Sequence, residues 1–142
     1  MALSEFRSVM RFRVPFCDID MMQHVNNAAY VVWAETLRCV YFAEVLQGTS
    51  LAGRDGLILA KLEITYERPL AYRENVAVGC RVTRIGNKSF DFLCEVWSDD
   101  TQQRSAVCTA AVVAYDYEAN HSIPIPQSWR ERIAAHEVVA PV

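Results

Sequence analysis

Apolar and polar positions divide the chain into one helical region and several strand-like regions. Residues from Ala28 to about Gln47 are apolar on nearly every side, and a helix of this kind is normally buried on nearly every side. Its few polar or charged residues are Glu35, Thr36, Arg38 and Glu44. Asn26 or Asn27 is suited to cap the start of this helix, and Gly48 is expected to end it.

The other segments alternate between apolar and polar residues, which is typical of half-buried β-strands. The predicted strands are Phe6–Phe16, Leu57–Tyr66, Asn75–Ile85, Ser89–Trp97 and Arg104–Tyr117. Residues 86–88 form a hairpin turn in this prediction, and Ser128–His136 a short helix. One long helix followed by antiparallel strands predicts a single α+β domain over residues 1–142, in which a curved sheet of about five strands wraps the helix. Dimerisation can cover the open edges of such a sheet.

Composition and charge exclude several classes of protein. Hydrophobic residues make up 52% of the chain and charged residues 22%, and the net charge is −3. Because no stripe of Lys and Arg is present, a nucleic-acid partner is not expected. The apolar helix carries Glu35 and Arg38, which argues against a membrane span, and the N-terminal residues do not resemble a secretory signal. Five scattered cysteines without a C-x-x-C motif indicate reduced thiols in a cytoplasmic protein.

The densest group of polar side chains lies between the first predicted strand and the helix, in residues 18–27. Asp20 is the first candidate for a catalytic group. As a nucleophile it needs only ionisation and alignment, whereas as a general base it needs a pKa raised by burial, and a turn-forming Asp is the structural alternative. His24 can orient a water, shuttle a proton, or serve a structural role. Met21, together with Met22, is suited to line an adaptable apolar pocket, and simple packing of the two side chains is the structural alternative.

Other catalytic motifs are absent from the sequence. A metal site needs three or four convergent ligands, and no His, Cys, Asp and Glu spacing provides them, so no metal is expected. Residues 48–52 (Gly-Thr-Ser-Leu-Ala) depart from the G-x-S-x-G motif at Ala52 and follow a helix rather than a strand. No glycine-rich phosphate-binding motif occurs, which argues against a nucleotide phosphate loop.

Several segments together carry a family resemblance from about Arg11 to Tyr117. They are Val14-Pro15-Phe16-Cys17-Asp18-Ile19-Asp20, His24-Val25-Asn26-Asn27-Ala28-x-Tyr30 with Glu35 and Arg38, Ile64-Thr65-Tyr66-Glu67-Arg68-Pro69, and Ile85-Gly86-Asn87-Lys88-Ser89-Phe90. This pattern resembles the hotdog-fold acyl-CoA thioesterases of the 4-hydroxybenzoyl-CoA thioesterase type. The resemblance implies a homodimer, or a tetramer built as a dimer of dimers, with active sites at the subunit interface.

The resemblance also implies roles for single residues. The second Asp of the family motif is the catalytic carboxylate, and it corresponds to Asp20. Backbone N–H groups near Asn27 would polarise the thioester carbonyl, Lys88 would contact coenzyme A phosphates, and Tyr30 would contact the substrate. The family commonly has Gly where this chain has Gln23, which puts the shape of the loop in question.

The expected function is hydrolysis of a fatty-acyl or aromatic acyl-CoA, with Asp20 at the reacting centre and His24 in an auxiliary role. No cofactor is expected apart from the coenzyme A of the substrate. The alternative is a non-catalytic module that binds acyl-CoA or an acyl carrier, and loss of the acidic residue would be its sequence mark. Hydratases also use hotdog scaffolds, but they usually carry a different His/Asp pattern.

Overall fold

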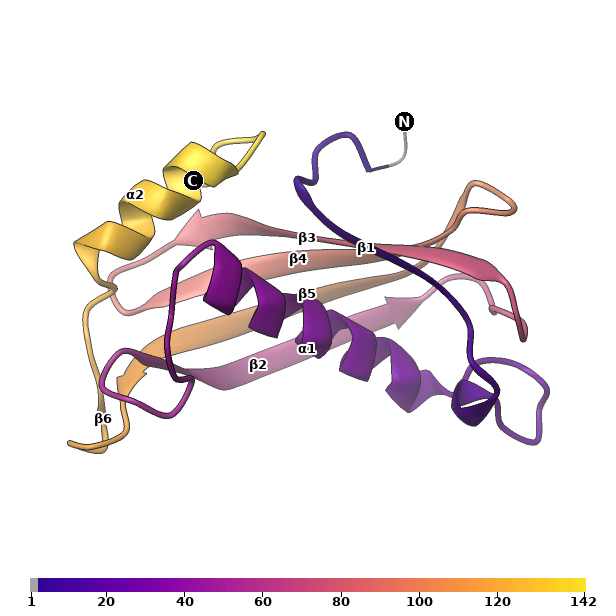
Figure 1. Cartoon of the computed structure of the whole chain (residues 1–142), viewed down its shortest axis with the longest axis horizontal. Helices are drawn as coiled ribbons and strands as arrows, with labels where there is room; N and C mark the ends of the chain where they lie inside the picture. The colour runs from indigo at the N-terminus through magenta and orange to yellow at the C-terminus, as the bar shows by residue number, and fades with distance from the viewer. Residues whose placement is uncertain (1–2) are drawn as a thin grey trace.

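The computed structural model describes residues 3–142, which form one antiparallel sheet with a long helix across it and a short helix at one end (Figure 1). The strands run in the order β1-β3-β4-β5-β2, and β6 pairs with β5. This arrangement confirms the predicted α+β class. The elements are β1 Ser8–Arg13, a 3-10 turn Phe16–Asp18, α1 Asn27–Glu44, β2 Gly56–Tyr66, β3 Asn75–Ile85, β4 Ser89–Ser98, β5 Gln103–Asp116, β6 His121–Ser122 and α2 Gln127–His136.

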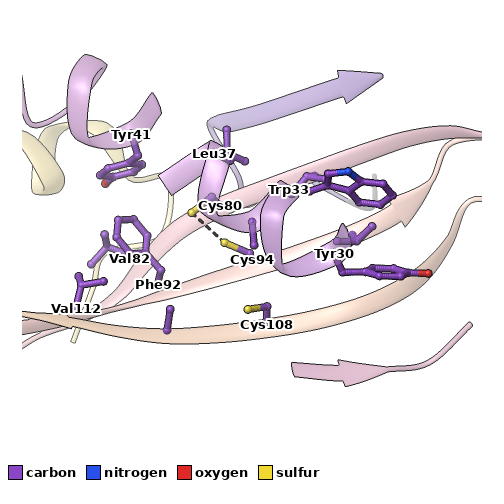
Figure 2. Packing of buried hydrophobic residues seen from close by; sticks show 14 of the residues in the cluster. Tyr30, Trp33, Leu37, Tyr41, Cys80, Val82, Phe92, Cys94, Cys108 and Val112 are labelled. Atoms are coloured by element: carbon purple, nitrogen blue, oxygen red, sulfur yellow. Dashed lines mark hydrogen bonds between the residues drawn. The ribbon is translucent and has the colours of Figure 1, made fainter. Parts of the chain in front are cut away.

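The core lies between α1 and one face of the sheet. Alternate residues of β3, β4 and β5 are buried on this face, as the period-two pattern predicts. The helix packs Tyr30, Trp33, Leu37 and Tyr41 onto it, at the three- and four-residue spacing of a single helix face (Figure 2). The sheet therefore fixes the position of α1, and with it the position of both helix ends.

Three of the five cysteines lie in a row across the core. Cys80 of β3 is opposite Cys94 of β4, which is opposite Cys108 of β5. The thiol of Cys94 donates a hydrogen bond to the sulfur of Cys80 at 3.2 Å, and all three side chains are buried (Figure 2). Cys17 and Cys39 are exposed free thiols, so none of the five forms a disulfide.

The helix is less enclosed than predicted. Its sheet-facing side is buried, but Val32 is 57% exposed and Val40 is 38% exposed on the opposite side. The prediction of a helix buried on nearly every side is therefore wrong for the single chain, because the sheet covers one side of α1 only. The helix begins one residue earlier than predicted and ends at Glu44, three residues before Gln47.

Gly48 lies just after the end of α1, where it was predicted to stop the helix. The residue with a positive φ after the helix is Gln47, at 56°, and Gly48 is not in the left-handed region. A Cβ atom on Gly48 would collide with the ring of Phe42. Glycine fits here because the Phe42 ring packs against the backbone. The Gly48 N–H closes the helix end by donating a hydrogen bond to the Phe42 carbonyl at 3.0 Å, while Gln47 takes the left-handed conformation.

The first strand is shorter than predicted, and one long strand lies at an edge. β1 covers only Ser8–Arg13, because the 3-10 turn at Phe16–Asp18 follows Pro15 and redirects the chain toward α1. β2 pairs with β5 on one side only, so its other edge carries no strand within the part of the chain that the structure describes.

No helix in residues 3–142 combines the length and the apolar character that crossing a membrane requires.

Candidate functional site

The polar block of residues 18–27 forms a closed loop at the N-terminal end of α1. A bridge between Ile19 and Val25 joins the two sides of the loop. Asp18 ties the loop to the helix, since its Oδ2 accepts a hydrogen bond from the indole N–H of Trp33 at 3.0 Å. The backbone carbonyl of Asp18 accepts a second hydrogen bond, from the Asn26 N–H at 2.7 Å. The loop is thus held from within and from the first turns of the helix.

Asp20 lies inside this loop with its carboxylate fixed by two donors. Its Oδ1 accepts a hydrogen bond from the Met22 N–H at 2.9 Å, and its Oδ2 accepts one from the Asn26 side-chain amide at 3.2 Å. The residue is half-buried. Because an ionised carboxylate has about four acceptor positions, both oxygens keep capacity for a water or for a substrate proton.

Asn26 connects this carboxylate to the helix. Its side-chain oxygen accepts a hydrogen bond from the Ala28 N–H at 2.8 Å, so Asn26 is the N-cap, one of the two predicted candidates. The N–H of Asn27 has no acceptor among residues 3–142. A free N–H at the positive end of the helix dipole can bind an oxygen on which negative charge develops.

Asp20 and Asn27 border a cavity of about 380 Å³ at the end of the sheet where β2 stops. The cavity brings together four of the predicted site residues, namely Asp20, His24, Asn27 and Tyr30. The remaining lining residues are Met22, Val25, Tyr66, Glu67, Arg68 and Pro69. Of the predicted pair Met21 and Met22, only Met22 lines the cavity, whereas Met21 is 99% exposed.

Two tyrosines form one wall of the cavity. Tyr30 is almost fully buried, and burial raises the pKa of its hydroxyl to about 12. Its ring meets the ring of Tyr66 edge to face, with centroids 5.2 Å apart. The Tyr66 hydroxyl donates a hydrogen bond to the Asn27 carbonyl at 2.7 Å, which joins the end of β2 to the first turn of α1. The segment from Tyr66 to Pro69 is part of the family pattern, but the sequence alone did not assign it to the site.

His24 is exposed at the edge of the cavity, and its ring has no hydrogen-bond partner in the described chain. Its carbonyl accepts a hydrogen bond from the Asp20 N–H at 3.2 Å. The preceding residue, Gln23, has a φ of 65°, which explains why glycine suits this position in the resembling family. Within residues 3–142, no three His, Cys, Asp or Glu side chains are grouped so that they could hold a metal ion.

Lys88 lies at the other end of the sheet. Its carbonyl accepts a hydrogen bond from the Ala114 N–H, whereas Tyr66 at the cavity pairs with Ala106. Eight residues of β5 therefore separate the two positions, which is roughly 26 Å. Within one chain the structure does not bring Lys88 to the cavity, so its contact with coenzyme A stays a prediction.

Comparison with known proteins agrees with this arrangement. A family model described as the thioesterase-like superfamily matches residues 14–133. A thioesterase from Thermus thermophilus, solved as a complex with coenzyme A and Zn, is 28% identical, with a TM-score of 0.85 over 98% of this chain and 99% of that chain. A comparison with curated protein sequences gave no match.

Two more distant structures show the same fold. A predicted thioesterase from Bacillus stearothermophilus is 22% identical, with a TM-score of 0.82 over 94% of this chain and 98% of that chain. A 1,4-dihydroxy-2-naphthoyl-CoA thioesterase from Synechocystis is 16% identical, with a TM-score of 0.76 over 89% of this chain and 94% of that chain. Together with the matched family, these likenesses confirm the expected hotdog fold.

Proposed function

This chain belongs to the thioesterase-like superfamily, and on that basis we propose that it hydrolyses the thioester of a fatty-acyl or aromatic acyl-CoA to the free acid and coenzyme A. One observation carries the proposal: Asp20 and Asn27 line the same cavity, and the N–H of Asn27 has no acceptor among residues 3–142. The coenzyme A in the Thermus thermophilus thioesterase, which is 28% identical, supports this class of substrate.

Asn27 contributes through its backbone. The thioester carbonyl oxygen accepts a hydrogen bond from the Asn27 N–H, and the positive end of the α1 dipole stabilises the negative charge that develops there. Such a donor typically lowers the barrier by about 2.7–4 kcal/mol. The hydrogen bond from Tyr66 to the Asn27 carbonyl holds this turn of the helix against β2.

Asp20 acts on the carbonyl carbon in one of two ways. As a nucleophile it forms a mixed anhydride and expels the coenzyme A thiolate, and water then hydrolyses the anhydride. As a general base it removes a proton from a water that attacks the thioester directly. In both routes the leaving thiolate takes up a proton, and the free ring of His24 at the cavity edge is placed to supply it.

A single-turnover reaction in ¹⁸O-labelled water separates the two routes. The nucleophilic route places one ¹⁸O atom in the Asp20 carboxylate when water opens the anhydride at the enzyme side, and mass spectrometry of the peptide that contains Asp20 detects it. Label in the product acid alone indicates either the general-base route or attack at the acyl side of the anhydride. Trapping with hydroxylamine then separates these, because attack at the enzyme side of an anhydride leaves a hydroxamate on Asp20, whereas the thioester itself gives only an acyl hydroxamate.

The function itself is tested by thiol release from short, medium, long-chain and aromatic acyl-CoAs, with wild type beside Asp20→Asn. We expect turnover on at least one class of substrate, and a loss of about 10²–10⁴-fold in the variant. Circular dichroism of the variant checks that the fold is retained. Near-normal activity of Asp20→Asn would refute the assignment of Asp20. Saturable acyl-CoA binding without turnover by the wild type would instead identify a non-catalytic binding module.

A further inference from the structure

A second cavity, of about 520 Å³, lies at the other end of α1 from the candidate active site. It is bordered by the start of β1, the C-terminal half of α1 and the last turns of α2, which lie side by side in Figure 1. Its apolar wall includes Val9, Leu37 and Val45. The volume falls within the range of roughly 300–1,000 Å³ that is common for small-molecule sites. From Asn27 to Leu37 the helix rises by roughly 15 Å, so the two cavities are distinct.

The polar rim of this cavity carries an excess of positive charge. The guanidinium of Arg7 is exposed and has no ion-pair or hydrogen-bond partner in residues 3–142. Arg132 is half-buried and donates one N–H to the Leu46 carbonyl at 2.9 Å, which leaves its other donors free. Among residues 3–142, Glu44 is the one carboxylate that lines the cavity. Two guanidinium groups and one carboxylate leave one net positive charge, which matches a monoanion better than a phosphate dianion.

His136 lines the same cavity. Its Nε2 is 2.9 Å from the Ser8 hydroxyl, and its ring meets the Tyr41 ring edge to face at 5.4 Å. Burial lowers the pKa of His136 below its ordinary value; the adjacent Glu137 opposes this shift, and the positive charge of Arg7 adds to it. A bound anion beside the imidazole would favour its protonated form.

We infer that this cavity binds a small monocarboxylate with an apolar body, with the carboxylate held by Arg7 and Arg132 and the apolar part against Leu37 and Val45. The forked donors of a guanidinium match the two oxygens of a carboxylate. This binding does not depend on the proposed hydrolysis, although the acid that the hydrolysis would release belongs to the same chemical class.

The three histidines of the chain allow a test that resolves the two sites. His24 lines the candidate active site, His136 lines the second cavity, and His121 lies in the exposed strand β6. The ring signals are followed by NMR against pH, first without ligand, then with hexanoate, and then with the neutral hexanamide. We expect hexanoate to raise the pKa of His136 by about one unit. We expect His121 to be unchanged, and hexanamide to leave all three pKa values in place.

Two variants make the test specific. Arg7→Gln removes an exposed side chain and should weaken hexanoate binding, followed at His136, by at least about tenfold, which corresponds to about 1.4 kcal/mol. Arg54→Gln is the matched control, because Arg54 is exposed, pairs with Glu118 and lies outside the cavity. The inference would be overturned if hexanoate changed the pKa of His24 alone or of no histidine. It would also be overturned if Arg7→Gln bound hexanoate, followed at His136, as tightly as the wild type.

Discussion

The two ends of α1 are both held by hydrogen bonds, but the bonds join very different parts of the chain. At the N-terminal end, Asp20 bonds to Met22 and Asn26, which are two and six residues away. At the C-terminal end, Glu137 accepts hydrogen bonds from the Tyr41 hydroxyl at 2.6 Å and from the Val82 N–H at 2.9 Å, over 96 and 55 residues. The first network is half-exposed, and the second is buried.

This difference separates function from stability. The loop network can be built by one short segment, so it orients a carboxylate without holding distant elements together. The buried network joins α1, β3 and the chain that follows α2, so its loss removes tertiary interactions. We therefore expect substitutions at the N-terminal end to change activity more than stability, and substitutions at the C-terminal end to do the reverse.

The largest expected effect is that of Glu137→Ala on stability. The substitution leaves the Tyr41 hydroxyl and the Val82 N–H buried without a partner, which should lower the free energy of unfolding by about 3 kcal/mol. Thiol release per folded molecule should stay near that of the wild type. Urea unfolding measures the first quantity, and Glu131→Ala on the exposed side of α2 is the control. Equal stability of the two variants would contradict the role given to the buried network.

The next effect is that of Asn26→Ala on turnover. This change removes both the N-cap of α1 and the donor to Asp20 Oδ2, so kcat should fall by about 10–100-fold, or about 1.4–2.7 kcal/mol. The free energy of unfolding should fall by only about 1 kcal/mol, the usual contribution of a cap.

Asn27→Ala is the matched control for that variant. It keeps the backbone N–H that is proposed to bind the carbonyl oxygen, so its steady-state activity should remain within about threefold of wild type, which is a change of barrier below about 0.7 kcal/mol. If Asn27→Ala were as inactive as Asn26→Ala, the proposed backbone role of Asn27 would be wrong.

A smaller effect concerns the pH dependence of stability. Burial raises the pKa of Tyr30 from 10.0 to about 12 in the folded protein. As the pH rises, the Tyr30 hydroxyl therefore loses its proton in the unfolded chain before it does so in the folded protein. The contribution of this hydroxyl to the free energy of unfolding is complete below pH 10 and is lost as the pH rises toward 12. In urea unfolding from pH 9 to 12, Tyr30→Phe should reduce the decline in stability. The exposed Tyr72→Phe serves as control and should leave the decline unchanged.

The smallest effect is expected for Gln23→Gly. The left-handed φ at Gln23 costs a non-glycine residue about 1–2 kcal/mol, which glycine would recover. The greater conformational freedom of glycine in the unfolded chain offsets about 0.5–1 kcal/mol of this recovered free energy. The net result should be a stabilisation of about 0.5 kcal/mol, measured by urea unfolding, with activity unchanged. Gln23→Ala keeps the strain and should give no gain. A stabilisation by Ala equal to that by Gly would show that backbone strain is not the cause.

The fold and much of the site could be predicted from the sequence for the same physical reason. Alternation and the long apolar run reflect burial by neighbouring elements, so the strands and α1 were predicted within a few residues. Asp20, His24, Asn27 and Tyr30 lie together because the loop and the first helical turn contain all of them. Met21 lies outside the cavity that Met22 lines, because neighbouring residues in a loop can face opposite directions.

Tertiary structure alone decided the features that depend on distant segments. It placed Tyr66 against the Asn27 carbonyl, 39 residues away, and it placed Lys88 at the opposite end of the sheet. It also brought Ser8 and His136, 128 residues apart, to one cavity. Local sequence determines turns, caps and periodicity because these interactions act within a few residues. Which strand or helix meets another depends on the register and packing of the whole sheet.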